Sequence, residues 1–176
     1  MYRNTNAGIV QHGFTMIELL VVVAILAIAA AIVVPMASSA GSMQLRAAVN
    51  MVAADLEYAK SMSISRGQRY AVQFFDVVGG TYHQYKVVDQ NGNPVRHPIT
   101  QKAEYVVSFQ NDSRLGQVEI SGVNFNGTDK ISFDSLGSPF DGIGANLNTG
   151  VITLRAGGIT RTVNVEPVTG YISVSN

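Results

Sequence analysis

The sequence contains no cysteine, and this absence removes several kinds of chemistry at once. Without cysteine the chain has no disulfides, no thiolate nucleophile and none of the commonest structural zinc sites. The absence is compatible with either a reducing or an oxidising compartment. The location of the protein must therefore be inferred from the topology of the chain.

An excess of charge of one sign is also lacking. The 12 Lys and Arg residues balance the 12 Asp and Glu residues. A chain with this balance lacks the positive field that attracts nucleic acids or anionic lipid head groups. We therefore expect no nucleic-acid partner.

Catalytic motifs are missing as well. The three histidines are His12, His83 and His97, and the sequence has no H-E-x-x-H, no G-x-S-x-G and no phosphate-binding loop. We expect His83 and His97 at exposed strand or loop positions. We accordingly predict that the protein is not an enzyme and needs no cofactor.

A group of side chains with oxygen atoms is the only candidate for a metal site, and calcium prefers such ligands. The spacing of these residues matches no EF-hand loop, and acidic residues beside glycines are typical of turns. We therefore predict no metal, with a calcium site as the alternative. The group comprises Asn124, Asn126, Asp129, Asp134, Asp141 and Asn146.

The sequence does have one long hydrophobic run, at residues 19–34, which are sixteen consecutive apolar residues. Residues 14–34 would form a helix ~31 Å long, which matches the hydrocarbon thickness of a bilayer. Within residues 1–13, Arg3, His12 and the terminal amine supply positive charge, and no acid lies among these residues. This pattern predicts a single transmembrane helix with a cytoplasmic start.

Cleavage as an ordinary secretory signal is the alternative, with residues 29–31, three alanines, as a possible site. Glu18 argues against it, because a charge at the membrane-entering end of the run has an energetic cost that an ordinary signal does not need. The helical pattern also continues beyond Pro35. The run is thus predicted to be an anchor that is kept.

Residues 13–20 read GFTMIELL and are followed by the apolar run and then by Pro35. This string resembles the processing and assembly signature of type IV pilins and type II secretion pseudopilins. The resemblance implies that a prepilin peptidase removes residues 1–13 by cutting between Gly13 and Phe14, and that the new amine of Phe14 is N-methylated. Gly13 suits this cleavage, because a residue without a side chain lets a protease approach the backbone closely.

Glu18 has a physical role that does not depend on the resemblance. A carboxylate near a helix start is stabilised by the helix dipole and by the ammonium of Phe14. Its partner is either the Phe14 amine of its own chain, one turn away, or that of a neighbouring subunit, which the resemblance implies and we favour. The second pairing would set the register of a helical assembly.

Beyond the anchor, residues 35–66 are predicted to continue the helix as an amphipathic segment. Pro35 cannot donate a helical hydrogen bond, so we expect a kink there. Ser65-Arg66-Gly67 provides a helix stop. The apolar stripe, which should pack on the downstream domain, comprises Leu45, Val49, Val52, Leu56, Ala59 and Met62, and the charged residues on the same helix are Arg46, Asp55, Glu57 and Lys60.

Residues 67–176 are predicted to form an antiparallel β-domain, so the fold class is α+β. The segment contains short runs of β-branched and aromatic residues between turn signals. Phe74, Phe75, Phe109, Phe125 and Phe133 are expected in the core. The eight strand candidates cover residues 70–77, 82–89, 104–110, 118–120, 130–133, 151–154, 160–165 and 171–174.

The carboxy-terminal pattern adds a second resemblance. Residues 131–139, 150–154, 160–165 and 170–172 resemble the periplasmic domain of the GspH/FimT pseudopilins, which are minor subunits located at a filament tip. Residues 77–114 are the part that this resemblance constrains least.

Together the two resemblances imply a pilin-like fold and a structural role. The implied function is that of a minor pseudopilin at or near the tip of a type II secretion pseudopilus, which supports protein export across the outer membrane. The implied partners are other pseudopilins or minor pilins, the prepilin peptidase, the inner-membrane assembly platform and membrane lipid. The chain would cross the inner membrane once, with its β-domain in the periplasm.

Two alternatives remain. One is a minor pilin of a type IV pilus, which serves assembly or DNA uptake. From Gln117 onward only three bases stand against five acids, so the phosphate contacts needed for DNA capture are poorly supplied. The other is a membrane-tethered periplasmic binding module, which would need a polar constellation in the β-domain.

Overall fold

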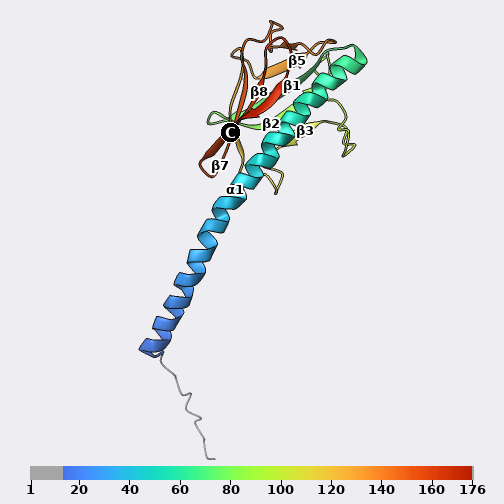
Figure 1. Ribbon diagram of the computed structural model, residues 1–176. Coiled ribbons are helices and arrows are strands. Elements are labelled where there is room, and N and C mark those ends of the chain that lie inside the picture. Colours follow the sequence, from blue (N-terminus) through green and yellow to red (C-terminus); the bar gives the residue numbers. More distant parts are fainter. Residues whose placement is uncertain (1–13, 176) are drawn as a thin grey trace, which may run out of the picture. The chain divides into compact units, whose positions relative to one another are not determined.

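A computed structural model describes residues 14–175 of the chain, except for the side chains of residues 32–40. One long helix, α1 (Met16–Arg66), is followed by nine strands (Figure 1), which confirms the predicted α+β class. The strands are β1 (Tyr70–Val78), β2 (Thr81–Val88), β3 (Val106–Ser108), β4 (Glu119–Phe125), β5 (Lys130–Phe133), β6 (Pro139–Phe140), β7 (Gly150–Ala156), β8 (Ile159–Val165) and β9 (Ile172–Ser175).

The contacts divide the chain into two compact units, Met1–Ser38 and Ser39–Asn176. We call them unit 1 and unit 2. The described part of unit 1 is the first portion of α1 with the two residues that precede it. Unit 2 contains the rest of α1 and all nine strands.

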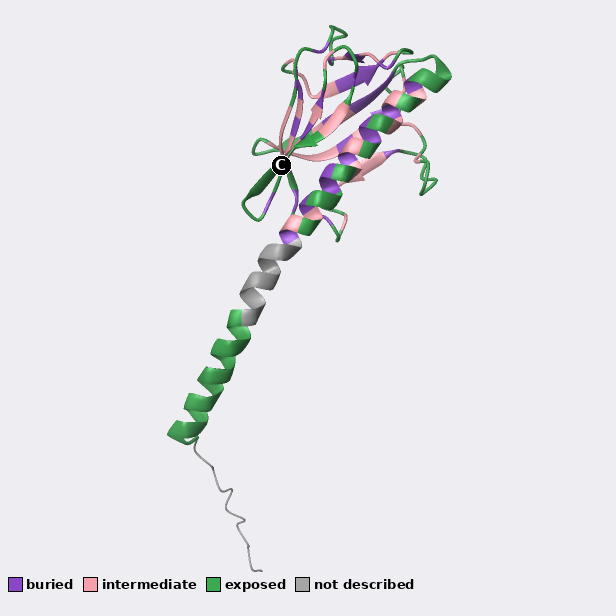
Figure 2. Ribbon diagram, in the orientation of Figure 1, coloured by how far each residue is buried: buried purple, intermediate pink, exposed green. Residues whose placement is uncertain are grey.

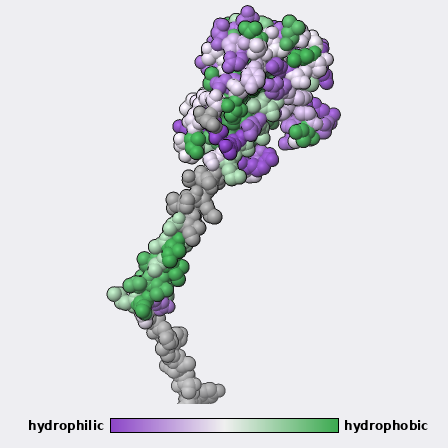
Figure 3. Space-filling model, in the orientation of Figure 1, coloured by the Kyte–Doolittle hydropathy of each residue, from purple (hydrophilic) through white to green (hydrophobic). Residues whose placement is uncertain are grey.

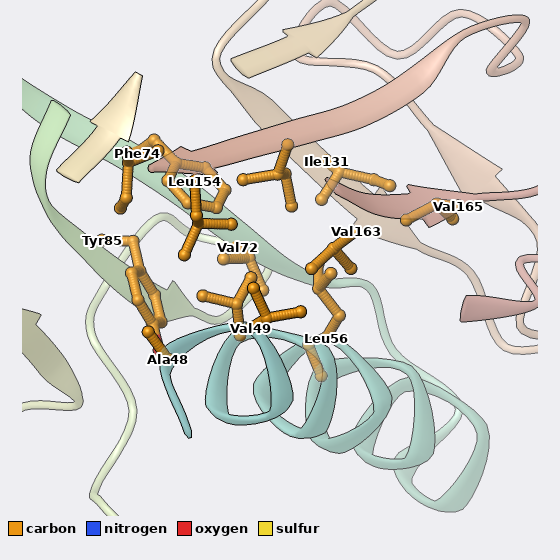
Figure 4. Packing of buried hydrophobic residues seen from close by; sticks show 14 of the residues in the cluster. Ala48, Val49, Leu56, Val72, Phe74, Tyr85, Ile131, Leu154, Val163 and Val165 are labelled. Atoms are coloured by element: carbon orange, nitrogen blue, oxygen red, sulfur yellow. The ribbon is translucent and has the colours of Figure 1, made fainter. Parts of the chain in front are cut away.

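Within unit 2, α1 packs on the sheet through one stripe of small and branched side chains (Figure 4). The predicted stripe is confirmed, since its members are buried apart from Met62, which is partly buried against the same cluster. Buried side chains from β1, β2, β4, β5, β7 and β8 and from several loops lie in the same core cluster. The buried helix residues are Leu45, Ala48, Val49, Val52, Leu56 and Ala59.

The nine strands form one antiparallel sheet in the order β6-β5-β1-β2-β4-β7-β8-β9, with β3 also paired to β2. The central pair is β1 and β2, a hairpin in which Phe74 lies opposite Tyr85. Four of the five phenylalanines expected in the core are buried, and Phe75 is half-buried. The sheet therefore gives unit 2 a single core, with α1 as its second layer.

The helix ends where its sequence predicts. Its last residue is Arg66, and Gly67 has a φ of 64°. In this left-handed region a residue without Cβ has no steric penalty, so glycine ends the helix at low cost. Ser63 Oγ then accepts the backbone N–H of Tyr70 at 3.1 Å, which ties the start of β1 to the helix.

Three hairpin turns share one design, D-x-x-G-x, beginning at Asp89, Asp134 and Asp141. In each, a carboxylate oxygen accepts backbone N–H groups two and four residues further on. The glycine at the fourth position has a φ of 82°, 82° and 90° respectively. Aspartate here satisfies backbone donors that the turn leaves unpaired.

Two of the six oxygen-bearing residues considered as calcium ligands, Asp134 and Asp141, begin such turns. Asp134 and Asp141 accept backbone N–H groups in this way, and Asn126 Oδ1 accepts those of Asn148 and Thr149 at 2.9 and 3.0 Å. Among the described residues, no group of three or more acidic or histidine side chains is arranged to hold a metal ion. The geometry supports the turn interpretation.

Candidate processing and assembly site

The amino-terminal end of α1 is closed by a reciprocal pair of hydrogen bonds between Thr15 and Glu18. Thr15 Oγ1 accepts the backbone N–H of Glu18 at 3.3 Å, and Glu18 Oε2 accepts the backbone N–H of Thr15 at 3.5 Å. The first helical bond runs from the N–H of Leu19 to the carbonyl of Thr15 at 3.2 Å. This arrangement is a capping box, with Thr15 as the N-cap residue.

The capping box has a direct consequence for the charge of Glu18. The first N–H groups of a helix have no partner inside the helix, and together they carry a partial positive charge. The carboxylate of Glu18 lies at this end and is held there by a backbone donor. The start of the helix therefore offers Glu18 both a hydrogen-bond donor and a favourable potential.

The apolar side chains that follow are exposed around the whole helix. Ile17, Leu20, Ile25 and Ile28 are between 60% and 72% exposed, and Figure 2 shows the first described part of α1 as uniformly exposed. Figure 3 shows the same segment as a continuous hydrophobic surface. Nothing in the described part of unit 1 covers these side chains, and burying them in another apolar environment would be favourable.

The structure also bears on the predicted membrane span, residues 14–34. Its last residues fall among those whose side chains are not described. Over the part of the chain that the structure does describe, no helix combines the length and the apolar character needed to cross a bilayer.

The predicted site residues are placed as follows. Phe14 precedes α1 and is 80% exposed, one turn from Glu18. Gly13 and the predicted leader, residues 1–13, lie outside the described residues, as does the side chain of Pro35. The cleavage site and the kink at Pro35 therefore stay predictions.

Sequence reasoning missed the capping role of Thr15. The signal was present, because Thr15-Met16-Ile17-Glu18 fits the pattern T-x-x-E that marks a helix start before an apolar run. Thr15 was noted only as a part of the processing signature.

A second polar cluster is buried in unit 2, where α1 meets the sheet. Asp55 of α1 is 7% exposed, and its two carboxylate oxygens accept hydrogen bonds from the hydroxyls of Tyr85 and Tyr105, each at 2.6 Å. The ring of His97 lies on that of Tyr105, with 4.1 Å between the centroids. His97 Nδ1 accepts the backbone N–H groups of its own loop.

Burial dominates the titration behaviour of this cluster. It raises the pKa of Asp55 above its ordinary value, and the hydrogen bonds from Tyr105 and Tyr85 only partly oppose the rise. Burial, together with the nearby carboxyl group, also raises the pKa of both tyrosines. Both hydroxyls therefore keep their protons and donate to Asp55 at every ordinary pH.

The role of Asp55 is to connect three elements. Tyr85 belongs to β2, and Tyr105 immediately precedes β3, so the carboxyl group ties both strands to α1. Sequence reasoning grouped Asp55 with the charged residues of the helix and did not find its burial. The expectation of exposed histidines also fails, since His83 and His97 are both half-buried.

Two family models match the chain. The model described as type II transport protein GspH matches residues 48–169, and that described as prokaryotic N-terminal methylation motif matches residues 10–34. The first covers most of unit 2, and the second covers the predicted cleavage site and the capped start of α1. No curated protein sequence matches this chain.

Two solved structures are similar to the chain, both of the type IV minor pilin FimU from Pseudomonas aeruginosa strain PAO1. The crystal form in space group P65 is 12% identical, with a TM-score of 0.48, and the match covers 75% of this chain and 93% of that one. The form in space group P21 is 13% identical, with a TM-score of 0.49 and coverages of 77% and 90%.

Proposed function

Because the chain belongs to the GspH family of type II transport proteins, we propose that it is a minor pseudopilin at or near the tip of a type II secretion pseudopilus. Its role there is structural, and it supports the export of proteins across the outer membrane. The observation that carries this proposal is the family match over residues 48–169, joined to a methylation motif at residues 10–34. A pseudopilin or minor pilin role follows from these matches.

The proposed maturation uses the start of α1. A prepilin peptidase removes residues 1–13, and the amine of Phe14 is then methylated. The new ammonium lies one turn from Glu18, whose carboxylate the capping box holds at the helix start. In the filament, Glu18 receives the Phe14 ammonium of a neighbouring subunit, which neutralises both charges in an apolar environment.

The exposed apolar surface of unit 1 supports the proposed location. Before assembly, residues 14–34 anchor the chain in the inner membrane, with the leader in the cytoplasm and unit 2 in the periplasm. During assembly, neighbouring helices replace the lipid, and the assembly platform of the inner membrane drives this exchange. Lipid and helices suit the same surface, because both are apolar.

A minor pilin of a type IV pilus is the second candidate, because the methylation motif is expected of both systems. Its DNA-uptake form is disfavoured by charge. Among the three bases after Gln117, Arg155 is paired with Glu119 at 2.8 Å. That pairing leaves few cations for phosphate contacts in this part of the chain.

The proposal is tested by deleting the protein in its own bacterium and measuring secreted proteins and surface pili in parallel. Loss of extracellular enzymes with normal pili, restored by the wild-type chain but not by Glu18→Ala, would support the pseudopilus role. Loss of pili with normal secretion would move the protein to the type IV system. If neither changes, the proposed function is wrong.

A further inference from the structure

Strand β3 (Val106–Ser108) pairs with β2, a central strand of the sheet, and within the described residues it has one unpaired edge of its own. One edge of β2 is paired with β1 throughout, whereas its other edge is shared by β3, opposite residues 84–86, and by β4, opposite Tyr82. β3 has no second neighbour among the described residues. Its far edge is therefore unpaired.

The hydrogen bonds show which groups of β3 point outward. The carbonyl of Tyr105 accepts the N–H of Val87 at 3.0 Å, and the N–H of Phe109 donates to the carbonyl of His83 at 3.3 Å. Residues 105, 107 and 109 thus face β2, and by the alternation of antiparallel strands Val106 and Ser108 face away from it. Within the described part of the chain, their N–H and C=O groups have no protein partner.

A groove runs along this edge and includes side chains from both faces of the sheet. Val107 lies opposite Tyr85, whose side chain points toward α1, and Met51 of α1 lines the groove on the same side. Gln84 and Ser108, which pair with each other, line it on the opposite side. The groove therefore follows the edge of the strand, where an added strand would lie ~4.8 Å away.

Among the described residues, one end of the groove carries an unpaired positive charge, and the other end carries an ion pair. Lys102 lies in the loop before β3, and within the described part of the chain it has no ion pair. At the other end, Arg114 is paired with Asp112 at 2.7 Å. That ion pair is neutral as a whole, so the net positive charge of the groove comes from Lys102, and it favours an acidic side chain in whatever occupies the groove.

We infer that the edge of β3 receives an extended segment, with an acidic side chain directed at Lys102, from a neighbouring subunit of the filament. Such a segment would extend the sheet through the N–H and C=O groups of Val106 and Ser108. These few bonds are too weak to capture a free protein. They suit a partner that the filament already holds alongside, because its effective concentration is high; the inference thus rests on the proposed function.

The Asp55 cluster prepares this edge for binding. The hydroxyl of Tyr105 is fixed on Asp55 at 2.6 Å, one residue before β3 begins. The backbone N–H of Tyr105 also donates to the carbonyl of Val95 at 2.6 Å. β3 is consequently held in position before any partner arrives, which lowers the entropic cost of adding a strand.

Crosslinking of the full-length chain in the assembling bacterium tests the inference. A photoreactive amino acid is placed at Asn111, which lines the groove and is exposed, and separately at Ile25 in the apolar part of α1. Adducts are identified by mass spectrometry. We expect the Asn111 probe to join a different pilin-like subunit, through an extended segment of that subunit.

A matched pair of variants isolates the backbone contribution. Ser108→Pro removes one outward N–H but no bond to β2, and edge strands tolerate proline. It should lower the yield of the Asn111 adduct about fivefold, as expected for one lost hydrogen bond, and leave the Ile25 adduct unchanged. Ser108→Ala keeps the N–H and should change the yield of neither adduct. Both variants should unfold thermally at similar temperatures.

Lys102→Glu provides a second variant that leaves the backbone intact, and it should also weaken the Asn111 adduct selectively. The inference is overturned if Ser108→Pro and Lys102→Glu leave that adduct unchanged. It is also overturned if the Asn111 probe gives no adduct, or joins only an exported protein or a second copy of this chain, while Ile25 crosslinks normally. Absence of adducts at both positions would refute the proposed function, and this inference with it.

Discussion

The two portions of α1 differ in how far their apolar side chains are buried. In unit 2, Leu56 and Val52 are fully buried against the sheet, whereas in unit 1 Ile25 and Leu26 are 60% and 62% exposed. Both portions are regular helix, so secondary structure does not distinguish them. The difference is that the helix packs on a sheet in unit 2, whereas the described residues of unit 1 contain no second layer.

This comparison explains the distribution of polar groups along the helix. In unit 2 a polar residue can be buried when the sheet supplies partners, as Tyr85 and Tyr105 do for Asp55. In unit 1 the acidic residue Glu18 stands at the end of the helix, where unpaired N–H groups and the dipole stabilise it. Each carboxylate thus lies where its surroundings offer donors.

The largest expected effect on stability comes from truncating one side chain of the buried stripe. Leu56→Ala should lower the free energy of unfolding of unit 2 by about 2 to 5 kcal/mol, because it removes buried methyl groups and leaves a cavity. Urea unfolding of the full chain in detergent, followed by the fluorescence of its tyrosines, measures this change.

Ile25→Ala is the matched control in unit 1, since it truncates an exposed side chain of the same helix. It should change the unfolding of unit 2 by less than about 0.5 kcal/mol. Equal losses for the two variants would mean that the two portions of α1 do not differ in the way described.

Removing the buried carboxylate should have the next largest effect. Asp55→Ala leaves two buried tyrosine hydroxyls without their acceptor, so we expect a loss of about 1 to 3 kcal/mol in the free energy of unfolding. Glu57→Ala, on the same turn of the helix but exposed, should be close to neutral. An Asp55→Ala variant as stable as Glu57→Ala would show that the cluster contributes nothing.

The pH dependence of stability gives a finer test of the same site. Because burial raises the pKa of Asp55 above 3.8, the folded chain holds this proton more tightly than the unfolded chain does. This tighter binding of the proton stabilises the folded chain. Its contribution to the free energy of unfolding is full below pH 3.8 and is lost as the pH rises through the raised pKa. At higher pH the free energy of unfolding no longer changes through this group.

Asp55→Asn removes this titration while keeping the size of the side chain. The stability of the wild type relative to Asp55→Asn should therefore fall as the pH rises from about 3.8, and then level off. Urea titrations at several pH values measure the difference. A difference that is flat, or that grows with pH, would contradict the raised pKa.

The smallest effect is expected at the start of unit 1. Thr15→Ala removes the cap, which should destabilise the first turn by about 1 kcal/mol. Amide hydrogen exchange at Glu18, whose N–H donates to Thr15 Oγ1, and at Leu19 in detergent should then be about fivefold faster. Thr15→Ser keeps the hydroxyl and should exchange like the wild type, so equal acceleration in both variants would rule out a capping role.

Much of this fold could be predicted from the sequence, because its main signals are periodic. The apolar stripe of α1 repeats every three or four residues, and all eight predicted strands overlap observed ones. The missed strand, β6, has only two residues, which is too short for any alternation to show. β4 was predicted to end at Ile120, whereas the strand continues to Phe125 beyond a register shift between Ile120 and Gly122.

The site was less predictable where it depends on partners distant in sequence. The environment of Asp55 is set by Tyr85 and Tyr105, which are 30 and 50 residues away. No local pattern marks an acid that will be satisfied by two such hydroxyls. The capping box could have been predicted from the sequence, because Thr15 and Glu18 are only three residues apart and interact locally.

The account depends most on the claim that unit 1 begins, after processing, with the amine of Phe14 beside Glu18. The direct measurement is the intact mass and first residue of the full-length chain expressed with and without a prepilin peptidase. We expect a chain that starts at Phe14 only when the peptidase is present, that carries one extra methyl group when the methylating activity is present, and that is not produced from Gly13→Ala. A chain that retains residues 1–13, or that begins near Ala31, would contradict the account.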